Sequence, residues 1–215
     1  MDSIILKRLL PKVFAGRTDI VSDIWQHPQV VFERGKNYLI EANSGTGKSS
    51  LCSYVFGYRN DYNGEILFDT QNIATLSISD WVQIRKRHIA LLWQELRLFP
   101  ELTAMENVQI KNKLTGFRKK KQITAWFERL GIAEQQDSLV GKMSFGQQQR
   151  VALIRTLCQP FDFLLADEPI SHLDEANSQI MSDILLEEAR AQGAALICTS
   201  IGKHLDLPYD HTFRV

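Results

Sequence analysis

The most constraining stretch of this sequence is a glycine-rich loop between an apolar run and a helix-like run. Residues 38–40 are predicted as a strand, residues 41–50 as the loop, and residues 51–56 as the start of a helix. Such a loop places successive backbone N–H groups and a helix N-terminus around an anion. Gly45 and Gly47 let the backbone approach that anion because neither carries a Cβ atom. The stretch therefore predicts a phosphate site at the end of a strand.

The same loop supplies side chains that suit a nucleotide. Lys48 can place its ammonium group on the β- and γ-phosphates, and the Ser49 hydroxyl can ligate Mg²⁺. Ala42 stands where the usual P-loop pattern has its first glycine, so the strict pattern fails by one methyl group. An ordinary Gly/Ser turn before a helix is the alternative interpretation. The residues expected to bind the nucleotide here are Asn43, Ser44, Gly45, Thr46, Gly47, Lys48, Ser49 and Ser50.

A second apolar run, residues 161–166, ends in two carboxylates and a proline, Asp167-Glu168-Pro169. Parallel sheets place their ligands at the carboxyl ends of strands, which is where these two acids are expected to lie. Asp167 can hold Mg²⁺ through its water shell, and Glu168 can orient and deprotonate an attacking water. A solvated strand end is the alternative, but it leaves the phosphate loop upstream unexplained.

The charge balance narrows the possible partners. Lys plus Arg and Asp plus Glu each number 25, and the formal net charge of +0 argues against a general nucleic-acid binder. No apolar run approaches the ~18 residues of a membrane helix, and the first residues do not resemble a signal peptide. We therefore expect a cytoplasmic protein whose membrane association comes through a partner. The three cysteines, Cys52, Cys158 and Cys198, are expected to be buried thiols.

Apolar, β-rich runs alternate with helix-like runs along the whole chain, which predicts an α/β fold with a largely parallel sheet. Turn-forming residues interrupt the first four strands, so that part is expected to be partly antiparallel. The predicted strands are residues 4–9, 30–32, 37–40, 65–68, 88–93, 163–166 and 194–199. The predicted helices are residues 48–56, 79–86, 104–111, 120–130, 147–158 and 175–192.

We expect one domain over residues 1–215. Its core covers about residues 1–93 and 160–215, and an inserted helical subdomain covers about residues 94–159. Within that insertion, four apolar side chains recur at helical spacing and are predicted to be core rather than partner-binding residues. They are Ile123, Trp126, Phe127 and Leu130.

Between the two candidate sites lies a further motif. Residues 143–152, Met-Ser-Phe-Gly-Gln-Gln-Gln-Arg-Val-Ala, resemble the signature motif of ATP-binding cassette (ABC) proteins, whose usual form is Leu-Ser-Gly-Gly-Gln. Gln94 closes a predicted strand as the family's Q-loop glutamine does, and residues 98–108 resemble the segment that follows it. Residues 171–174 resemble the D-loop, and Thr199-Ser200 occupies the place of the switch histidine.

The chain thus resembles ABC transporter ATPase subunits over almost its whole length. It is most similar to the branch that contains the ATPases of lipoprotein-release, macrolide-export and FtsE-type cell-division complexes. The resemblance implies an ABC-type nucleotide-binding domain of the P-loop NTPase class, with an antiparallel β subdomain and an inserted α-helical subdomain. It also implies ATP and Mg²⁺ as ligands, hydrolysis of ATP to ADP and phosphate, and a role in driving a transporter or a mechanotransmission complex.

In this family two subunits pack head to tail, and each nucleotide lies between one P-loop and the opposite signature. The resemblance therefore assigns Ser144, Gly146 and Gln147 to the nucleotide of a second ABC subunit, expected to be a second copy of this chain. Gln94 would touch the Mg²⁺ or the attacking water and link the site to an integral membrane permease. Asp174 would communicate across the dimer. The subunit is expected on the inner face of the cytoplasmic membrane, held there by its partner.

Two departures from the family pattern bear on catalysis. Ser200 stands in place of the switch histidine, and a serine is shorter and has no positive form. Phe145 replaces a signature glycine and places a ring where the backbone normally nears the phosphate. We therefore expect slow hydrolysis, with a nucleotide-gated dimerisation module that barely hydrolyses ATP as the alternative. His172 and His204 are the two candidates for compensating the missing histidine.

The adenine contact is less constrained. Phe14 lies at about the usual distance before the P-loop and is the candidate for stacking on adenine. A core phenylalanine is the equal alternative, and Trp25 is the rival aromatic residue. A soluble cassette ATPase of DNA repair or translation is a third possible function, but such chains usually carry long coiled-coil insertions or a second cassette.

Overall fold

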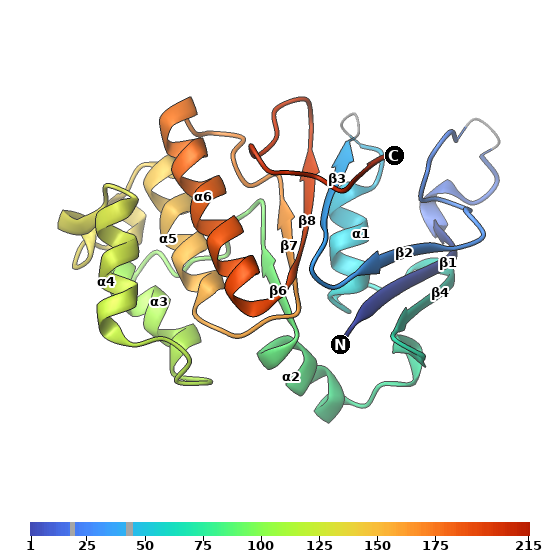
Figure 1. The fold of residues 1–215 in the computed structure, drawn as a ribbon, viewed down its shortest axis with the longest axis horizontal. Helices are drawn as coiled ribbons and strands as arrows, with labels where there is room; N and C mark the ends of the chain where they lie inside the picture. The colour runs from blue at the N-terminus through green and yellow to red at the C-terminus, as the bar shows by residue number, and fades with distance from the viewer. Residues whose placement is uncertain (18–19, 42–44) are drawn as a thin grey trace.

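The computed structural model describes residues 1–17, 20–41 and 45–215 and contains two β-sheets (Figure 1). The first sheet is antiparallel, with the strand order β2-β1-β4-β5. Three of the first four predicted strands lie in this sheet, which confirms that the N-terminal part is partly antiparallel. Its strands are β1 (Ser3–Pro11), β2 (Val30–Glu33), β4 (Tyr62–Phe68) and β5 (Gln71–Asn72).

The second sheet is parallel and has the strand order β6-β7-β8-β3-β9. The strand before the phosphate loop, β3, belongs to this sheet because it pairs with β8, for example Tyr38 with Ile197. The short strands β5 and β9 were not predicted, since neither carries a long apolar run. The parallel strands are β3 (Asn37–Glu41), β6 (Ile89–Leu92), β7 (Phe163–Asp167), β8 (Ala195–Ser200) and β9 (His211–Arg214).

All six predicted helices are present, with ends shifted by one or two residues. They are α1 (Lys48–Val55), α2 (Ile78–Arg87), α3 (Ala104–Asn112), α4 (Lys120–Arg129), α5 (Phe145–Leu157) and α6 (Glu175–Gln192). Short 3-10 turns cover Lys12–Phe14, Ile73–Thr75, Ala133–Gln135 and Val140–Lys142. Capping boxes at Ser77, Thr103 and Ser144 set the start of α2, α3 and α5, because each hydroxyl accepts a hydrogen bond from the third helical N–H.

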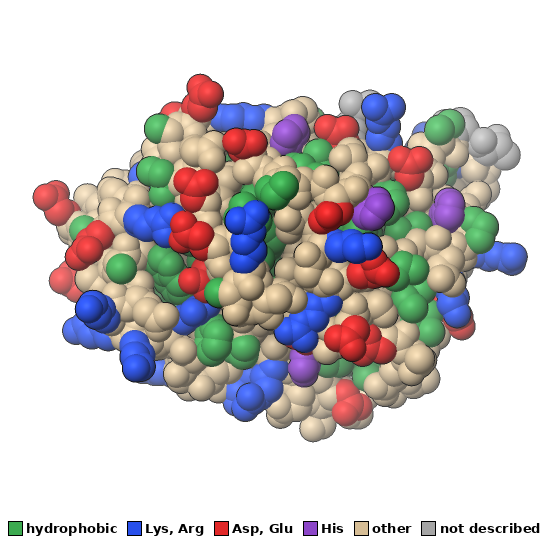
Figure 2. Space-filling model, viewed as in Figure 1, with side chains coloured by type: hydrophobic (Ala, Val, Ile, Leu, Met, Phe, Trp, Pro, Cys, Tyr) green, Lys and Arg blue, Asp and Glu red, His purple; other side chains and the backbone are tan. Residues whose placement is uncertain are grey.

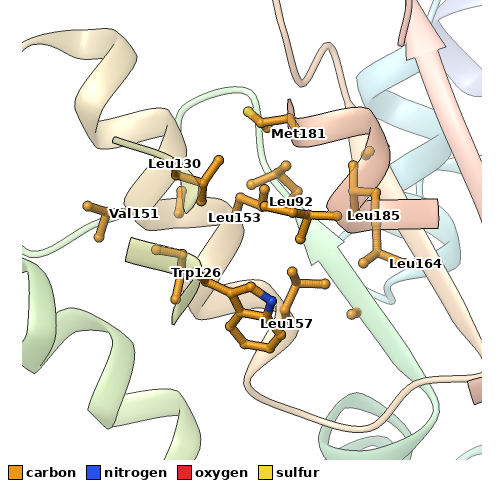
Figure 3. Close-up of a cluster of buried hydrophobic side chains, with 14 of the residues drawn as sticks. Leu92, Trp126, Leu130, Val151, Leu153, Leu157, Leu164, Met181 and Leu185 are labelled. Carbon is orange, nitrogen blue, oxygen red and sulfur yellow. The ribbon is translucent and has the colours of Figure 1, made fainter. Parts of the chain in front are cut away.

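Alternation along the central strands divides the interior into two cores. Leu164 and Ala166 of β7 face a cluster formed with α5 and α6, whereas Phe163 and Leu165 face a cluster formed with α1 and the antiparallel sheet. Successive strand residues point to opposite faces, so a strand covered on both sides is apolar throughout. In Figure 3, Leu92 and Leu164 from the sheet meet side chains of the helices on the first of these faces.

The helical segment shares its core with the sheet. Ile123, Trp126, Phe127 and Leu130 are at most 6% exposed and lie in the same cluster as the β7 residues, so their prediction as core residues is confirmed. Figure 3 shows Trp126 and Leu130 beside Leu153 and Leu157 of α5. The boundaries of the inserted subdomain, about 94 and 159, stay a prediction.

The surface carries no dominant sign of charge on the face in view. In Figure 2, Lys and Arg side chains lie among Asp and Glu side chains, as the balanced composition leads one to expect. Cys52, Cys158 and Cys198 are free and buried, as predicted. Within the described residues, none of the helices has the length and apolar character needed to cross a membrane.

Candidate functional site

A cavity of about 340 Å³ lies where β3 and β7 end. It brings together groups from three separate segments: the loop before α1, the end of β7 and the loop after β6. The predicted site residues that line it are Phe14, Gly45, Gly47, Lys48, Ser49, Ser50, Gln94 and Glu168. Three residues of the loop, Ala42, Asn43 and Ser44, lie outside the described residues. We refer to this space as the phosphate cavity.

Two aromatic rings support the phosphate loop from behind. Gly47 has φ 101°, and a Cβ atom there would lie 3.0 Å from the Trp25 ring and 3.2 Å from the Phe14 ring. The Trp25 indole also donates a hydrogen bond to the carbonyl of Thr46, at 3.0 Å. Position 47 therefore needs glycine for both its backbone conformation and its space. The support by Trp25 has no local sequence signal, since 21 residues separate it from Thr46.

Lys48 and Glu168 face each other inside the phosphate cavity. The Lys48 side chain is only 4% exposed, and its Nζ lies 3.8 Å from Glu168 Oε1. Burial lowers the pKa of Lys48, while the Glu168 and Asp167 carboxylates act against that shift. Gln94 Nε2 donates a hydrogen bond to Glu168 Oε2 at 3.2 Å. One carboxylate is thus held by an ammonium group on one side and an amide on the other.

Thr199 connects the two acids of β7. Its hydroxyl donates to Asp167 Oδ1 at 2.7 Å and accepts from the backbone N–H of Glu168 at 3.1 Å. Asp167 is 2% exposed, and Glu168 has a φ of 47°, which is uncommon for a residue with a side chain. The neighbouring strand therefore fixes where the two carboxylates point. Sequence reasoning had identified Thr199 only by its position in the family pattern.

The donor atoms of this site suit a magnesium ion. Asp167 supplies a buried carboxylate and Ser49 a hydroxyl in the first turn of α1, and Mg²⁺ prefers oxygen ligands together with water and phosphate oxygens. Gln94 adds an amide oxygen on the loop after β6. These are the residues expected from the sequence, and their chemistry fits the ion.

The signature segment lies apart from the phosphate cavity of its own chain. Ser144 is the N-cap of α5 and exchanges hydrogen bonds with Gln147, so its hydroxyl and the Gln147 amide close a capping box. The expected helix start near Gln147 is wrong by two residues, because this capping box begins the helix at Phe145. Neither Ser144 nor Gln147 lines the phosphate cavity, and Phe145 is 43% exposed. This end of α5 is free to meet another molecule.

The D-loop packs directly on that helix. A Cβ atom on Gly146 would lie 3.3 Å from Leu173 Cδ2, so the glycine permits the close approach. The Phe145 ring contacts the His172 ring edge-on, with centroids 4.6 Å apart. Asp174 caps α6 by accepting from the Asn177 backbone N–H at 2.8 Å. The signature helix and the D-loop therefore form one packed surface.

Arg150, which sequence reasoning missed, ties this surface together. Its guanidinium donates to the carbonyl of Gly146 at 3.1 Å and to Asn177 Oδ1 at 2.9 Å. Asn177 in turn contacts Asp174, so a chain of hydrogen bonds runs from the signature to the D-loop. Burial lowers the pKa of Arg150, and the nearby Asp174 carboxylate opposes that shift.

Ser200 lies at the end of β8 but does not line the phosphate cavity. It is 1% exposed, and its hydroxyl donates to the Lys203 carbonyl at 2.6 Å. The next residue, Ile201, lines the cavity instead and is 45% exposed. Neither candidate for compensation lines it either: the His204 ring contacts Tyr209, and the His172 ring contacts Phe145.

Comparison with known proteins agrees with this geometry. Residues 26–171 match the family model described as ABC transporter. The chain is 30% identical over 190 residues to YbbA of Escherichia coli, an ABC transporter ATP-binding protein, across 87% of this chain and 83% of the relative. It is also 30% identical over 192 residues to the lipoprotein-releasing system ATP-binding protein LolD of Shewanella denitrificans, across 86% and 81%. LolD belongs to the branch that the sequence resembled.

Solved structures give the same fold. The dimeric bacterial ABC transporter cassette MJ0796 superposes with a TM-score of 0.76 at 23% identity, over 91% of this chain and 87% of that chain. A bacterial Atm1-family ABC exporter with ATP bound superposes with a TM-score of 0.73 at 22% identity, over 93% and 34%. The predicted ABC cassette fold, with its antiparallel and parallel sheets and its helices, is confirmed. The chain belongs to the ABC transporter family.

Proposed function

We propose that this chain, an ABC transporter ATP-binding protein, hydrolyses ATP between two head-to-tail copies and so drives membrane subunits of a transporter or mechanotransmission complex. One observation carries the proposal. Lys48, Glu168 and Gln94 converge in one cavity, whereas Ser144 presents its helix end outside that cavity. Such a division leaves the signature available for the nucleotide of a second copy.

The chemistry assigned to each group follows from its contacts. Lys48 leaves its ion pair with Glu168 to bind the β- and γ-phosphates, together with Gly45, Thr46, Gly47, Ser49 and Ser50 and the undescribed Asn43 and Ser44. Glu168 then orients the attacking water and accepts its proton. Bound Mg²⁺, held by Ser49, Asp167 and Gln94, neutralises charge that develops on the phosphate oxygens.

Closure of the dimer assigns roles to the surface formed by α5 and the D-loop. Ser144, Gly146 and Gln147 contact the partner's nucleotide, because the N-terminus of α5 favours an anion. Asp174 reports the partner's state to the signature through Asn177 and Arg150. Phe14 lines the cavity but is 8% exposed, so it contacts adenine only where its edge reaches the surface.

Slow turnover is part of the proposal. The Ser200 hydroxyl is bound to the Lys203 carbonyl and so does not supply a donor to the γ-phosphate. One missing donor to a transition-state oxygen costs about 10²–10³ in rate. The alternative, an ATP-gated dimerisation module, is favoured by the same observation and differs only in whether phosphate is released.

The proposed location is the inner face of the cytoplasmic membrane, where an integral membrane permease holds the subunit. ABC transporter ATP-binding proteins and a lipoprotein-releasing protein among the relatives support this. A steady-state phosphate-release assay with purified protein and Mg-ATP tests the enzymatic proposal. Binding of a fluorescent ATP analogue without phosphate release would favour the gated module, and no binding at all would refute both.

A further inference from the structure

A second cavity, of about 310 Å³, lies below the parallel sheet and shares no described lining residue with the phosphate cavity. Its walls come from α2, β6, α3, α5 and the segment after α1, which surround the lower middle of the molecule in Figure 1. Four of its lining side chains are cationic: Arg85, Arg97, Lys111 and Arg155. No Asp or Glu is among its described lining residues. We call it the cationic cavity.

The four cations lack a compensating negative charge. Within the described part of the chain, none of them forms an ion pair with a carboxylate. Arg85 donates to the carbonyl of Phe56 at 3.0 Å, and Arg155 donates to that of Arg97 at 2.7 Å. Burial, with Arg155 nearby, lowers the pKa of Lys111 to about 8. Partly buried charges are normally paired, so the cavity is short of negative charge.

The rim of the cationic cavity has the composition of a protein interface. Tyr58 is 56% exposed and Ile110 is 41% exposed, and the Arg97 guanidinium lies 3.5 Å from the centre of a Trp93 ring. Tyr, Trp and Arg are the residues enriched where proteins bind one another. A free inorganic anion would satisfy the cations but leave these rings in water. A polypeptide with a carboxylate and an apolar neighbour satisfies both.

We propose that the cationic cavity receives an acidic side chain of a protein partner. The carboxylate enters among Lys111, Arg155 and Arg97, and an apolar neighbour packs on Tyr58 and Trp93. The inference deepens the proposed function and rests on it, because the partner in question is the membrane subunit that the cassette drives. It names the chemistry of that subunit's docking segment: an acidic residue flanked by apolar ones.

The cationic cavity is physically connected to the catalytic carboxylate. Arg155 donates to the carbonyls of Leu96 and Arg97, two residues with positive φ in the loop that follows Gln94. A carboxylate that binds Arg155 competes with these carbonyls and alters the hold on the loop. Gln94 itself is hydrogen-bonded to Glu168. Docking of the acidic segment therefore acts on the phosphate cavity through this loop.

The experiment compares a capped peptide containing two glutamates between leucines with the same peptide carrying glutamines. Binding to the purified protein is followed by titration calorimetry at low salt. Wild type is compared with Lys111→Met and with the control Lys113→Met, whose lysine is exposed at the end of the same helix. Wild type and Lys113→Met are expected to bind the glutamate peptide at least about tenfold more tightly than the glutamine peptide. Lys111→Met is expected to lose this preference.

A structural role for Lys111 makes a different prediction. If Lys111 served only the fold, Lys111→Met would lower the melting temperature, whereas removal of an unpaired buried charge is expected to leave it unchanged or raise it. Equal binding of both peptides to wild type, or an undiminished preference in Lys111→Met, would overturn the inference. Binding of a fluorescent ATP analogue is measured in parallel. Nucleotide binding without peptide discrimination defeats the docking inference alone, and loss of nucleotide binding in wild type defeats the proposed function.

Discussion

Replacing Glu168 by glutamine separates ATP binding from ATP hydrolysis. The substitution keeps the shape of the side chain and its contact with Gln94, but it removes the proton acceptor. Loss of a positioned general base lowers a rate by about 10²–10⁴. At 3.8 Å, the gross attraction between Lys48 and Glu168 is on the order of 4 kcal/mol at an effective dielectric constant near 20. Desolvation of both groups offsets most of it, so the variant is expected to fold.

The same ion pair sets the expected effect on nucleotide affinity. In Glu168→Gln, Lys48 no longer has to leave a carboxylate before it meets the phosphates, so ATP should bind at least as tightly as in wild type. Phosphate release at saturating ATP, nucleotide affinity, and gel filtration with ATP measure the three consequences, the last as accumulation of a dimer. Glu128→Gln, at an exposed position on α4, is the control. Hydrolysis by Glu168→Gln above a tenth of the wild-type rate would refute the assignment of Glu168 as the base.

Three further predictions concern other parts of the molecule. Ser200→His should raise phosphate release by about 10²-fold, because it restores one donor to the γ-phosphate; no rise would remove Ser200 as the cause of slow turnover. Burial lowers the pKa of Lys111 from 10.5 to about 8, so between those values the unfolded chain binds more protons than the folded one. The melting temperature of wild type relative to Lys111→Met should therefore increase from about pH 8 to above about pH 10, while the arginines of the cavity stay charged; a constant difference would contradict this. Gly64→Ala places a Cβ atom 2.4 Å from the Arg8 carbonyl oxygen at a φ of 93° and should cost more than the ~1–2 kcal/mol of strain expected for Gly116→Ala, which has open space; equal denaturation midpoints would show that the β1–β4 contact gives way.

The sequence predicted the elements whose signals are local. The capping boxes at Ser77 and Thr103, the helical spacing of Ile123 and Trp126, and the apolar run into Asp167 each depend on residues a few positions apart. Such patterns reflect the periods of helix and strand, so neighbouring residues suffice to specify them. The short edge strands β5 and β9 were missed because they are formed by pairing partners rather than by apolar runs of their own.

The sequence by itself determined which groups carry the chemistry. Lys48 and Glu168 follow predicted strands, and parallel strands bring their carboxyl ends to one edge of a sheet. The tertiary structure alone decided how these groups are held and what surrounds them. Trp25 supports the loop at Thr46, Thr199 orients Asp167, and the cationic cavity collects residues from segments up to about a hundred positions apart. These contacts depend on how the chain packs over long separations, and no local period or spacing records that packing.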